Sequence, residues 1–377
     1  MKDEKNNSGE NKRDNLNLMQ KVILISLSLI LIIFLDLFVR LFFPVSKPIA
    51  LYQVDNSAEI YFEDFSLGWK LIPQLEFKAK YNFFPTPKFP FAMRRYSIKT
   101  NSLGLRDIEI NMDENKKRII CLGDSITFGW GVDQFLTYPV HLEWMLNSMN
   151  NGQFEVINAG VPGYTSRQGL VFFTKKLLKL KPAYVIISFG ANDSTSAPVS
   201  DKQSIRYKSI SATLHNLFSF SRIYTLMRGS MLPLKKTLHR YNEPGRNIDV
   251  VNRVSPDDYY KNILEIVEVA QKNGCKPILL VTTEEDEYSS KMFMVASEKR
   301  ILLVKGYLSI LAHKREIMTD KRFINLRKTY INLLGEPNLM AHPDYFLFVD
   351  PVHPSAIGHK IMAEKIFEKL QLLESGN

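Results

Sequence analysis

The stretch Arg118-Ile119-Ile120-Cys121-Leu122-Gly123-Asp124-Ser125 decides the fold of this chain. Its apolar part has the length of a buried strand, and Gly-Asp-Ser is typical of a tight turn that leads into a helix. Two later apolar runs, Phe154–Asn158 and Ala183–Phe189, lie on either side of a segment with helical character. Strands that alternate with helices predict a parallel sheet covered by helices on both faces.

Capping signals outline the other elements of this α/β domain. Ser255 followed by Pro256 is typical of a helix start, and Gly274 of a helix end. We expect helices at Tyr138–Met149, near Ser166–Leu180, at 255–274 and after Ser355, and further strands at Lys276–Thr282 and, as a weaker signal, at Arg322–Leu326. The expected sheet therefore has about five strands.

An apolar segment near the N-terminus, Val22–Phe43, contains only two charged residues, Asp36 and Arg40. A helix needs about 20 mostly apolar residues to cross a bilayer, so we expect one transmembrane helix here. A cleaved signal peptide is the alternative, but the polar leader is long and no small-x-small pattern follows Phe43. Lys and Arg in the leader predict a cytoplasmic N-terminus for a single-pass protein, with the rest of the chain in the periplasm or outside the cell.

Composition divides the chain into four segments. Residues 1–21 form a polar cytoplasmic tail, 22–43 the transmembrane anchor, 44–117 an extended and partly strand-like lead-in, and 118–377 the main domain. Insertions near 194–254 and 327–349 interrupt the main domain, and the first contains an amphipathic segment at Leu214–Met227. An amphipathic helix can cover core or close over a site, and the sequence is compatible with both.

The formal net charge of +10 is unevenly distributed. Lys and Arg far outnumber Asp and Glu between Asp201 and Arg253, but no nucleic-acid-binding motif accompanies them, so no nucleic acid partner is expected. An anionic membrane surface, an acidic polymer, or a solvated face without a partner are the alternatives. Cys121 and Cys275 give no disulfide framework, and we expect two buried thiols.

Ser125 and the pair Asp350 and His353 carry the expected chemistry. A serine hydroxyl attacks an acyl carbon only when a neighbouring base takes its proton. Histidine is the usual base, and a carboxylate fixes its tautomer. Because three positions separate Asp350 from His353, one short loop can present both side chains. The pattern predicts an acyl hydrolase or an acyl transferase.

Acyl transfer also needs donors for the negative charge that develops on the carbonyl oxygen. The backbone N–H of Ser125 lies at the expected start of a helix, whose dipole favours an anion. Gly163, in a glycine-rich turn after the second strand, can bring its N–H close to a substrate. Asn192, after the third strand, offers a side-chain amide. We expect these three residues to form an oxyanion hole.

These blocks resemble the SGNH/GDSL hydrolase family, here as a membrane-anchored bacterial member. The resemblance covers about residues 118–370 and lies in Gly123-Asp124-Ser125, the turn with Gly163, Gly190-Ala191-Asn192-Asp193 and Asp350-Pro351-Val352-His353, in this order. It implies a flavodoxin-like three-layer α/β/α fold. We expect no cofactor, and no metal because no tight ligand spacing supports one.

The resemblance also implies roles for the site residues. It assigns Ser125 as nucleophile, His353 as base and then acid, and Asp350 as its orienting partner, with the oxyanion hole as above. The segment Asn101-Ser102-Leu103-Gly104-Leu105-Arg106-Asp107 looks like one that precedes the catalytic domain in membrane-anchored bacterial members. No role for it follows from the sequence.

Three functions remain open at this point. The first is a serine-dependent ester hydrolase that acts outside the inner membrane, on an ester or an acylated glycan. The second is an O-acyltransferase on a cell-surface glycan with the same catalytic residues. The third is a membrane-tethered binding module with a vestigial site, against which the complete set of site residues argues.

Overall fold

The computed structural model describes residues 17–42, 60–64, 66–80, 95–111, 113, 115–149, 152–203, 221, 250–314, 316, 319–334 and 344–374. The chain divides into two compact units: Met1–Pro48 with Thr213–Pro244, and Ile49–Ala212 with Gly245–Asn377. The N-terminal helix belongs to the first unit, and the sheet belongs to the second.

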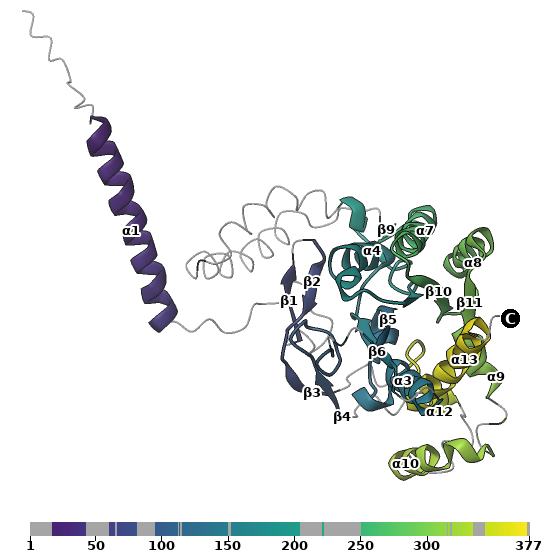
Figure 1. Ribbon diagram of the computed structural model, residues 1–377. Helices are drawn as coiled ribbons and strands as arrows, with labels where there is room; N and C mark the ends of the chain where they lie inside the picture. The colour runs from purple at the N-terminus through teal and green to yellow at the C-terminus, as the bar shows by residue number, and fades with distance from the viewer. Residues whose placement is uncertain are drawn as a thin grey trace, which may run out of the picture. The chain divides into compact units, whose positions relative to one another are not determined.

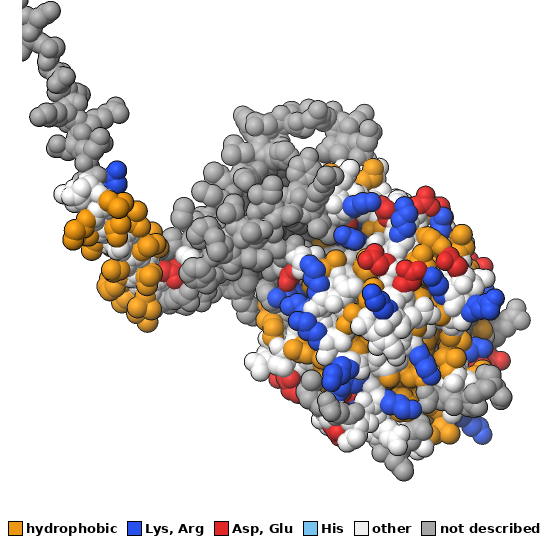
Figure 2. Space-filling view, turned by 45° about the horizontal axis from the view of Figure 1, so that its top comes forward, with side chains coloured by type: hydrophobic (Ala, Val, Ile, Leu, Met, Phe, Trp, Pro, Cys, Tyr) orange, Lys and Arg blue, Asp and Glu red, His pale blue; other side chains and the backbone are white. Residues whose placement is uncertain are grey.

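The N-terminal helix, α1, spans Leu18–Phe42 and begins earlier than the expected Val22. Asn17 and Gln20 explain the difference, because they form a reciprocal cap in which each side chain accepts a hydrogen bond from the other backbone N–H, at 2.8 and 3.0 Å. Its side chains are almost entirely hydrophobic and exposed (Figure 2). Among the described residues this is the one helix long and apolar enough to cross a membrane, with a mean hydropathy of 3.0 over Leu18–Val39.

The second unit is built on a five-stranded parallel sheet. Its strands are β5 (Lys117–Gly123), β6 (Phe154–Gly160), β7 (Tyr184–Ser188), β10 (Lys276–Val281) and β11 (Leu302–Lys305). Across the sheet they lie in the order β6-β5-β7-β10-β11. Taken in chain order this is 2-1-3-4-5, the order of flavodoxin-like folds, so the expected fold class is confirmed.

Helices cover both faces of the sheet (Figure 1). The described helices of the second unit are α2 (Ser125–Phe128), α3 (Tyr138–Met149), α4 (Ser166–Lys175), α7 (Pro256–Lys272), α8 (Glu287–Lys299), α9 (Gly306–Ala312), α10 (Ile324–Leu334), α12 (Asp344–Leu347) and α13 (Ala356–Glu374), with 3-10 turns η3 (Gln134–Leu136), η4 (Leu177–Leu180) and η5 (Lys321–Phe323). Ile120 and Leu122 of β5 pack with α4, α7 and α8, whereas Ile119 and Cys121 pack with α3, α9 and α13. This alternation follows from the two-residue period of a strand.

One strand prediction was wrong. Arg322–Leu326 is not a strand, because the Asp320 side chain accepts a hydrogen bond from Arg322 N–H at 2.9 Å and starts the turn η5, which continues into α10. The fifth strand is β11, which pairs with β10. The amphipathic segment Leu214–Met227 lies outside the described residues except for Ser221. Cys121 and Cys275 are buried free thiols, as expected.

The lead-in forms two small antiparallel hairpins. β1 (Tyr61–Asp64) pairs with β2 (Gly68–Leu71), and β3 (Glu76–Lys80) pairs with β4 (Arg95–Lys99). A further short pair, β8 (Ser196–Ala197) with β9 (Val251–Asn252), joins the two ends of the first insertion. Apolar residues of both hairpins belong to the same core as α4 and α7. The described part of the lead-in therefore belongs to the second unit.

Candidate active site

A tight turn at the end of β5 presents the Ser125 hydroxyl. Asp124 caps the short helix α2, and its carboxylate accepts a hydrogen bond from Ile126 N–H at 2.9 Å. A side chain at Gly123 would lie 2.1 Å from Thr127 Oγ1 and 2.8 Å from Ser188 O, so only glycine fits where the chain leaves the sheet. Burial raises the pKa of Asp124 to about 6, against the lowering effect of its hydrogen bonds.

A second turn, far along the chain, presents Asp350 and His353. The buried Asp350 carboxylate accepts hydrogen bonds from Val352 N–H and His353 N–H, both at 2.7 Å. Val349 N–H donates to His353 O at 2.9 Å and closes the turn. The chain therefore folds back so that the imidazole meets the carboxylate of its own turn, with Nδ1 2.6 Å from Asp350 Oδ2.

The two turns meet at the hydroxyl of Ser125. His353 Nε2 lies 2.8 Å from Ser125 Oγ, although 228 positions separate the two residues. With Nδ1 directed at a carboxylate, a neutral ring carries its proton on Nδ1 and offers Nε2 as an acceptor. This is the arrangement in which a histidine can take the proton of a serine. The structure thus brings together the three residues that the sequence singled out.

The expected oxyanion donors come from the ends of three neighbouring strands. Ser125 N–H is the first N–H of α2, and Gly163 lies in the loop after β6 with φ +81°. Neither N–H has a hydrogen-bond acceptor among the described residues. Asn192 lies in the loop after β7, but both of its amide hydrogens are engaged: Nδ2 donates to Asp124 Oδ2 at 3.2 Å and to Tyr164 O at 3.1 Å.

Asp193 ties the loops on this side of the site together. Its buried carboxylate accepts hydrogen bonds from Ser166 N–H at 2.9 Å and from the Ser166 hydroxyl at 2.6 Å, at the start of α4. Asn262 Nδ2 donates to the same hydroxyl at 3.0 Å. Burial raises the pKa of Asp193 to about 7, with a smaller raising effect from the negative charge of Asp124. Asp193 is thus a structural brace, and it does not face Ser125 through any described contact.

The segment at 101–107 supports the nucleophile turn, a role that sequence reasoning missed. The fully buried Arg106 guanidinium donates to the carbonyls of Phe128 and Gly129, at 2.7 Å each, and of Val132 and Ser97. It thereby satisfies the carbonyls at the C-terminal end of α2, where a positive charge is also favoured by the helix dipole. Burial lowers the pKa of Arg106 to about 10. The sequence signal for Arg106 was its place in the segment 101–107, which looks like one that precedes the catalytic domain in membrane-anchored bacterial members.

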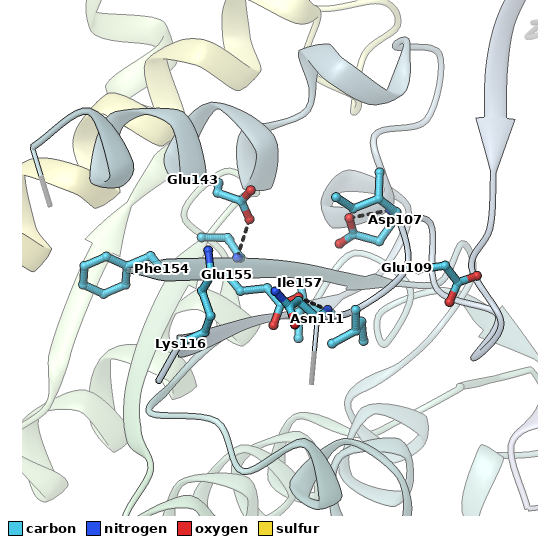
Figure 3. A pocket seen from close by; sticks show the side chains of 11 residues that line it. Asp107, Glu109, Asn111, Lys116, Glu143, Phe154, Glu155 and Ile157 are labelled. Atoms are coloured by element: carbon cyan, nitrogen blue, oxygen red, sulfur yellow. Dashed lines mark hydrogen bonds between the residues drawn. The ribbon is translucent and has the colours of Figure 1, made fainter. Parts of the chain in front are cut away.

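Asp107 belongs to a row of side chains along β6, the edge strand of the sheet. The outward N–H groups of Phe154, Val156 and Asn158 donate to Asn147 Oδ1, Glu143 Oε2 and Asp107 Oδ2, at 2.9, 2.6 and 2.8 Å. A pocket of about 190 Å³ lies beside these acidic groups (Figure 3). Burial raises the pKa of Asp107 to about 7. None of the expected catalytic residues lines this pocket, and two of its carboxylates, those of Asp107 and Glu143, accept hydrogen bonds from the strand edge.

Two further residues reach the loop that carries Gly163. Trp69, in hairpin strand β2, donates from Nε1 to Pro162 O at 3.1 Å, and the Tyr164 hydroxyl donates to Trp69 O at 2.6 Å. Arg253, just after β9, donates to Gly163 O at 2.8 Å. No sequence signal predicted either contact, because Trp69 and Arg253 are both distant from the loop in the chain. Among the described residues, no group of three or more His, Cys, Asp and Glu side chains is placed to hold a metal ion.

The family of the chain follows from its match to a known sequence model. A sequence model of the GDSL-like lipase/acylhydrolase family matches residues 121–361, which is more than half of the chain. The chain belongs to this family. The matched residues of this chain include Ser125, Gly163, Asn192 and the Asp350–His353 turn.

Individual relatives are more distant. The family member is 34% identical over 77 residues to the uncharacterized lipoprotein YqeF of Bacillus subtilis, which is 20% of this chain and 31% of that protein. It is 31% identical over 75 residues to thioesterase 1/protease 1/lysophospholipase L1 of Escherichia coli, which is 20% of this chain and 34% of that protein. The chain thus spans about a third of the length of these curated relatives.

Solved structures include a lipase/acylhydrolase from Enterococcus faecalis, with 18% identity and a TM-score of 0.39. That match covers 68% of this chain and 95% of the other.

Proposed function

We propose that this protein is a serine-dependent ester hydrolase, with residues 118–377 as its catalytic domain. The observation that carries the proposal is the continuous contact from Ser125 Oγ to His353 Nε2 and from His353 Nδ1 to Asp350 Oδ2, at 2.8 and 2.6 Å. Such a chain of contacts is what activates a serine for attack on an acyl carbon. Membership of a family of lipases and acylhydrolases supports the same chemistry.

The reaction follows from these contacts in two halves. His353 Nε2 takes the hydroxyl proton as Ser125 Oγ bonds to the ester carbonyl carbon, and Asp350 stabilises the resulting imidazolium. The tetrahedral intermediate collapses, the bond to the alcohol oxygen breaks, and His353 returns the proton to the departing alcohol. Water then gives its proton to His353 as it attacks the acyl-enzyme, and Ser125 leaves with that proton as the acid is released.

The oxyanion is stabilised by the N–H groups of Ser125 and Gly163 in this proposal. Both donors belong to the backbone, so they need no reorganisation when the charge develops. Asn192 becomes a third donor by exchanging Asp124 Oδ2, its more distant partner at 3.2 Å, for the substrate oxygen. Proton uptake by Asp124, whose pKa is raised to about 6, would make that exchange easier because it removes the charge that holds the amide.

A burst assay tests the proposal on the full chain in detergent micelles. With a short-chain nitrophenyl ester, wild type should show a burst of nitrophenolate followed by slower turnover, which is the sign of an acyl-enzyme. Ser125→Ala should abolish the burst and lower turnover by at least about 10⁴-fold. Ser148→Ala, which changes an exposed serine on α3, is the matched control and should behave as wild type.

The same experiment distinguishes the other functions. If an oligosaccharide acceptor diverts the acyl group from water to a sugar hydroxyl, the protein is an O-acyltransferase that uses the same residues. If wild type shows no turnover and a fluorophosphonate leaves Ser125 unmodified, the protein is a binding module and the proposal is wrong.

We also propose that α1 anchors the protein in a membrane, with the N-terminus in the cytoplasm and the catalytic domain outside. The mean hydropathy of 3.0 over Leu18–Val39 and the exposure of its apolar side chains support an anchor, and the basic leader supports this orientation. Carbonate-washed membranes should retain the protein, and N-terminal sequencing should find α1 still attached. A mature chain that begins after Phe43 would contradict the anchor.

A further inference from the structure

The loop after β6 contains a tight turn whose backbone type sets the direction of one peptide group. Val161-Pro162-Gly163-Tyr164 is a β-turn, because Tyr164 N–H donates to Val161 O at 3.1 Å. Proline at the second position and a φ of +81° at Gly163 identify it as type II. A type I turn has the same ends, but the peptide between its two central residues is flipped by roughly half a turn.

The peptide that distinguishes the two forms is the one between Pro162 and Gly163. Its N–H is the Gly163 donor of the proposed oxyanion hole. A trans peptide is planar, so its C=O and N–H point in opposite directions. Whatever fixes the Pro162 carbonyl therefore also fixes the direction of the Gly163 N–H.

The Trp69 indole fixes that carbonyl. Its Nε1 donates to Pro162 O at 3.1 Å, and its ring lies so close that a Cβ on Gly163 would be 3.0 Å from Cζ2. The other side of the loop faces the nucleophile turn: Val161 N–H donates to Gly123 O at 3.1 Å, and Asn192 connects Tyr164 O to Asp124. With the carbonyl held on the Trp69 side, the N–H is directed to the nucleophile side.

We infer that Trp69 is a positioning residue for the reaction: its indole N–H selects the type II turn and so aims the Gly163 N–H at the oxyanion. The inference rests on the proposed function, because it assumes that Gly163 is an oxyanion donor. A hydrogen bond to the carbonyl also polarises the peptide and makes its N–H a stronger donor.

Contacts around Trp69 hold the indole in place. The Arg253 guanidinium lies over the Trp69 ring, with 5.7 Å from Cζ to the ring centroid. Arg253 also donates a hydrogen bond to Gly163 O. An ion pair with Asp201, at 3.0 Å, holds the guanidinium in place. Tyr164 packs its ring edge against the indole at 5.8 Å and donates its hydroxyl to Trp69 O. The hairpin of the lead-in and the end of the first insertion thus both contribute to the support of this loop.

The test removes the indole N–H and keeps the ring. In Trp69→Phe, and in protein with 3-benzothienylalanine at position 69, the donor is absent while most of the packing remains. We expect kcat for the nitrophenyl ester to fall about tenfold with KM changed by less than about twofold, because the lost interaction matters in the transition state. Affinity for a trifluoromethyl ketone, which forms the oxyanion, should fall by a similar factor.

Trp144→Phe is the matched control, since Trp144 is an exposed tryptophan on α3 that contacts His141 rather than the loop. It should leave kcat and ketone affinity unchanged. If Trp69→Phe does not fold, the benzothienylalanine protein alone tests the role of the N–H, because its side chain keeps the shape of the indole.

Three results would overturn the inference. Unchanged kcat and ketone affinity in the benzothienylalanine protein would show that the N–H has no role in the turn. A rise in KM together with a lower melting temperature and unchanged kcat would show that Trp69 only supports the fold. Absence of turnover dependent on Ser125 in wild type would remove the proposed function itself, and the inference with it.

Discussion

The Asp350–His353 turn holds itself in shape, whereas the loop around Gly163 is held by residues from two distant parts of the chain. In the turn, Asp350 accepts the N–H groups of Val352 and His353 as well as the imidazole. In the loop, the carbonyls of Pro162 and Gly163 accept from Trp69 and Arg253, which lie 93 and 90 positions away.

The difference separates two kinds of requirement in the proposed site. A proton relay needs two side chains in contact, and a short turn can provide this contact locally. An oxyanion hole needs backbone N–H groups aimed at one point, and a backbone direction is fixed only by what contacts the other side of the peptide. Changes in the turn should therefore affect catalysis with little effect on stability, whereas changes around the loop should affect both.

The largest expected effect is on the turn side. Asp350→Asn should lower kcat by about 10⁴-fold, because an amide no longer fixes the histidine tautomer or stabilises the imidazolium. The asparagine oxygen can still accept the two N–H groups, so the melting temperature should change little. Steady-state kinetics and thermal unfolding measure the two quantities, with the exposed Asp113→Asn as control. A large fall in the melting temperature of Asp350→Asn would contradict the contrast between the Asp350–His353 turn and the Gly163 loop.

The next effect concerns the support of α2. Arg106→Lys should lower the free energy of unfolding by about 3 kcal/mol, since an ammonium cannot reach the four carbonyls that the guanidinium binds and leaves some unpaired. Arg300→Lys, at an exposed helix end, should cost less than about 0.5 kcal/mol. Urea unfolding compares the two variants. Equal costs would mean that the Arg106 contacts add nothing to stability.

The pH dependence of stability gives a third test. The pKa of Asp193 is raised to about 7, so folding favours its protonated form. The folded state then binds more protons than the unfolded chain between about pH 4 and 7, and the free energy of unfolding falls as pH rises through this range. Asp193→Asn should reduce that fall by about 3 kcal/mol.

The exposed Asp257 provides the control for this test, because Lys291 lowers rather than raises its pKa. Asp257→Asn should leave the fall in stability between pH 4 and 7 in place. If Asp193→Asn does the same, the Asp193 carboxylate does not carry the pH dependence.

The smallest effect sharpens the role of the loop. Gly163→Ala should cost about 1 kcal/mol of stability because φ is +81°. It should also lower kcat about tenfold, since alanine favours the type I turn and its Cβ would press on Trp69. Gly152→Ala has a similar φ of +75° with open space around it. It should show the same loss of stability with unchanged kcat, and a loss of activity there would contradict the assignment.

The sequence was sufficient for four of the five strands of the sheet and for the residues of the turn. Apolar runs that end in Gly-Asp-Ser or Gly-x-Asn-Asp mark strand ends, and parallel strand ends meet at one edge of a sheet. The contacts of Trp69, Arg106 and Arg253 could not be predicted, because each joins segments that are close only after folding. The strand at Leu302–Lys305 was missed because it is a short apolar run between two helices, and the side-chain cap at Asp320 made Arg322–Leu326 helical instead.

The row of side chains along β6 affects how this sheet edge can pair with strands of other molecules. An open sheet edge is a template on which a strand from another molecule can pair. On this edge the N–H groups of Phe154, Val156 and Asn158 are already taken by Asn147, Glu143 and Asp107. A neighbouring strand would have to displace all three acceptors before it could pair with β6, so this row of side chains opposes edge-to-edge association of the sheets.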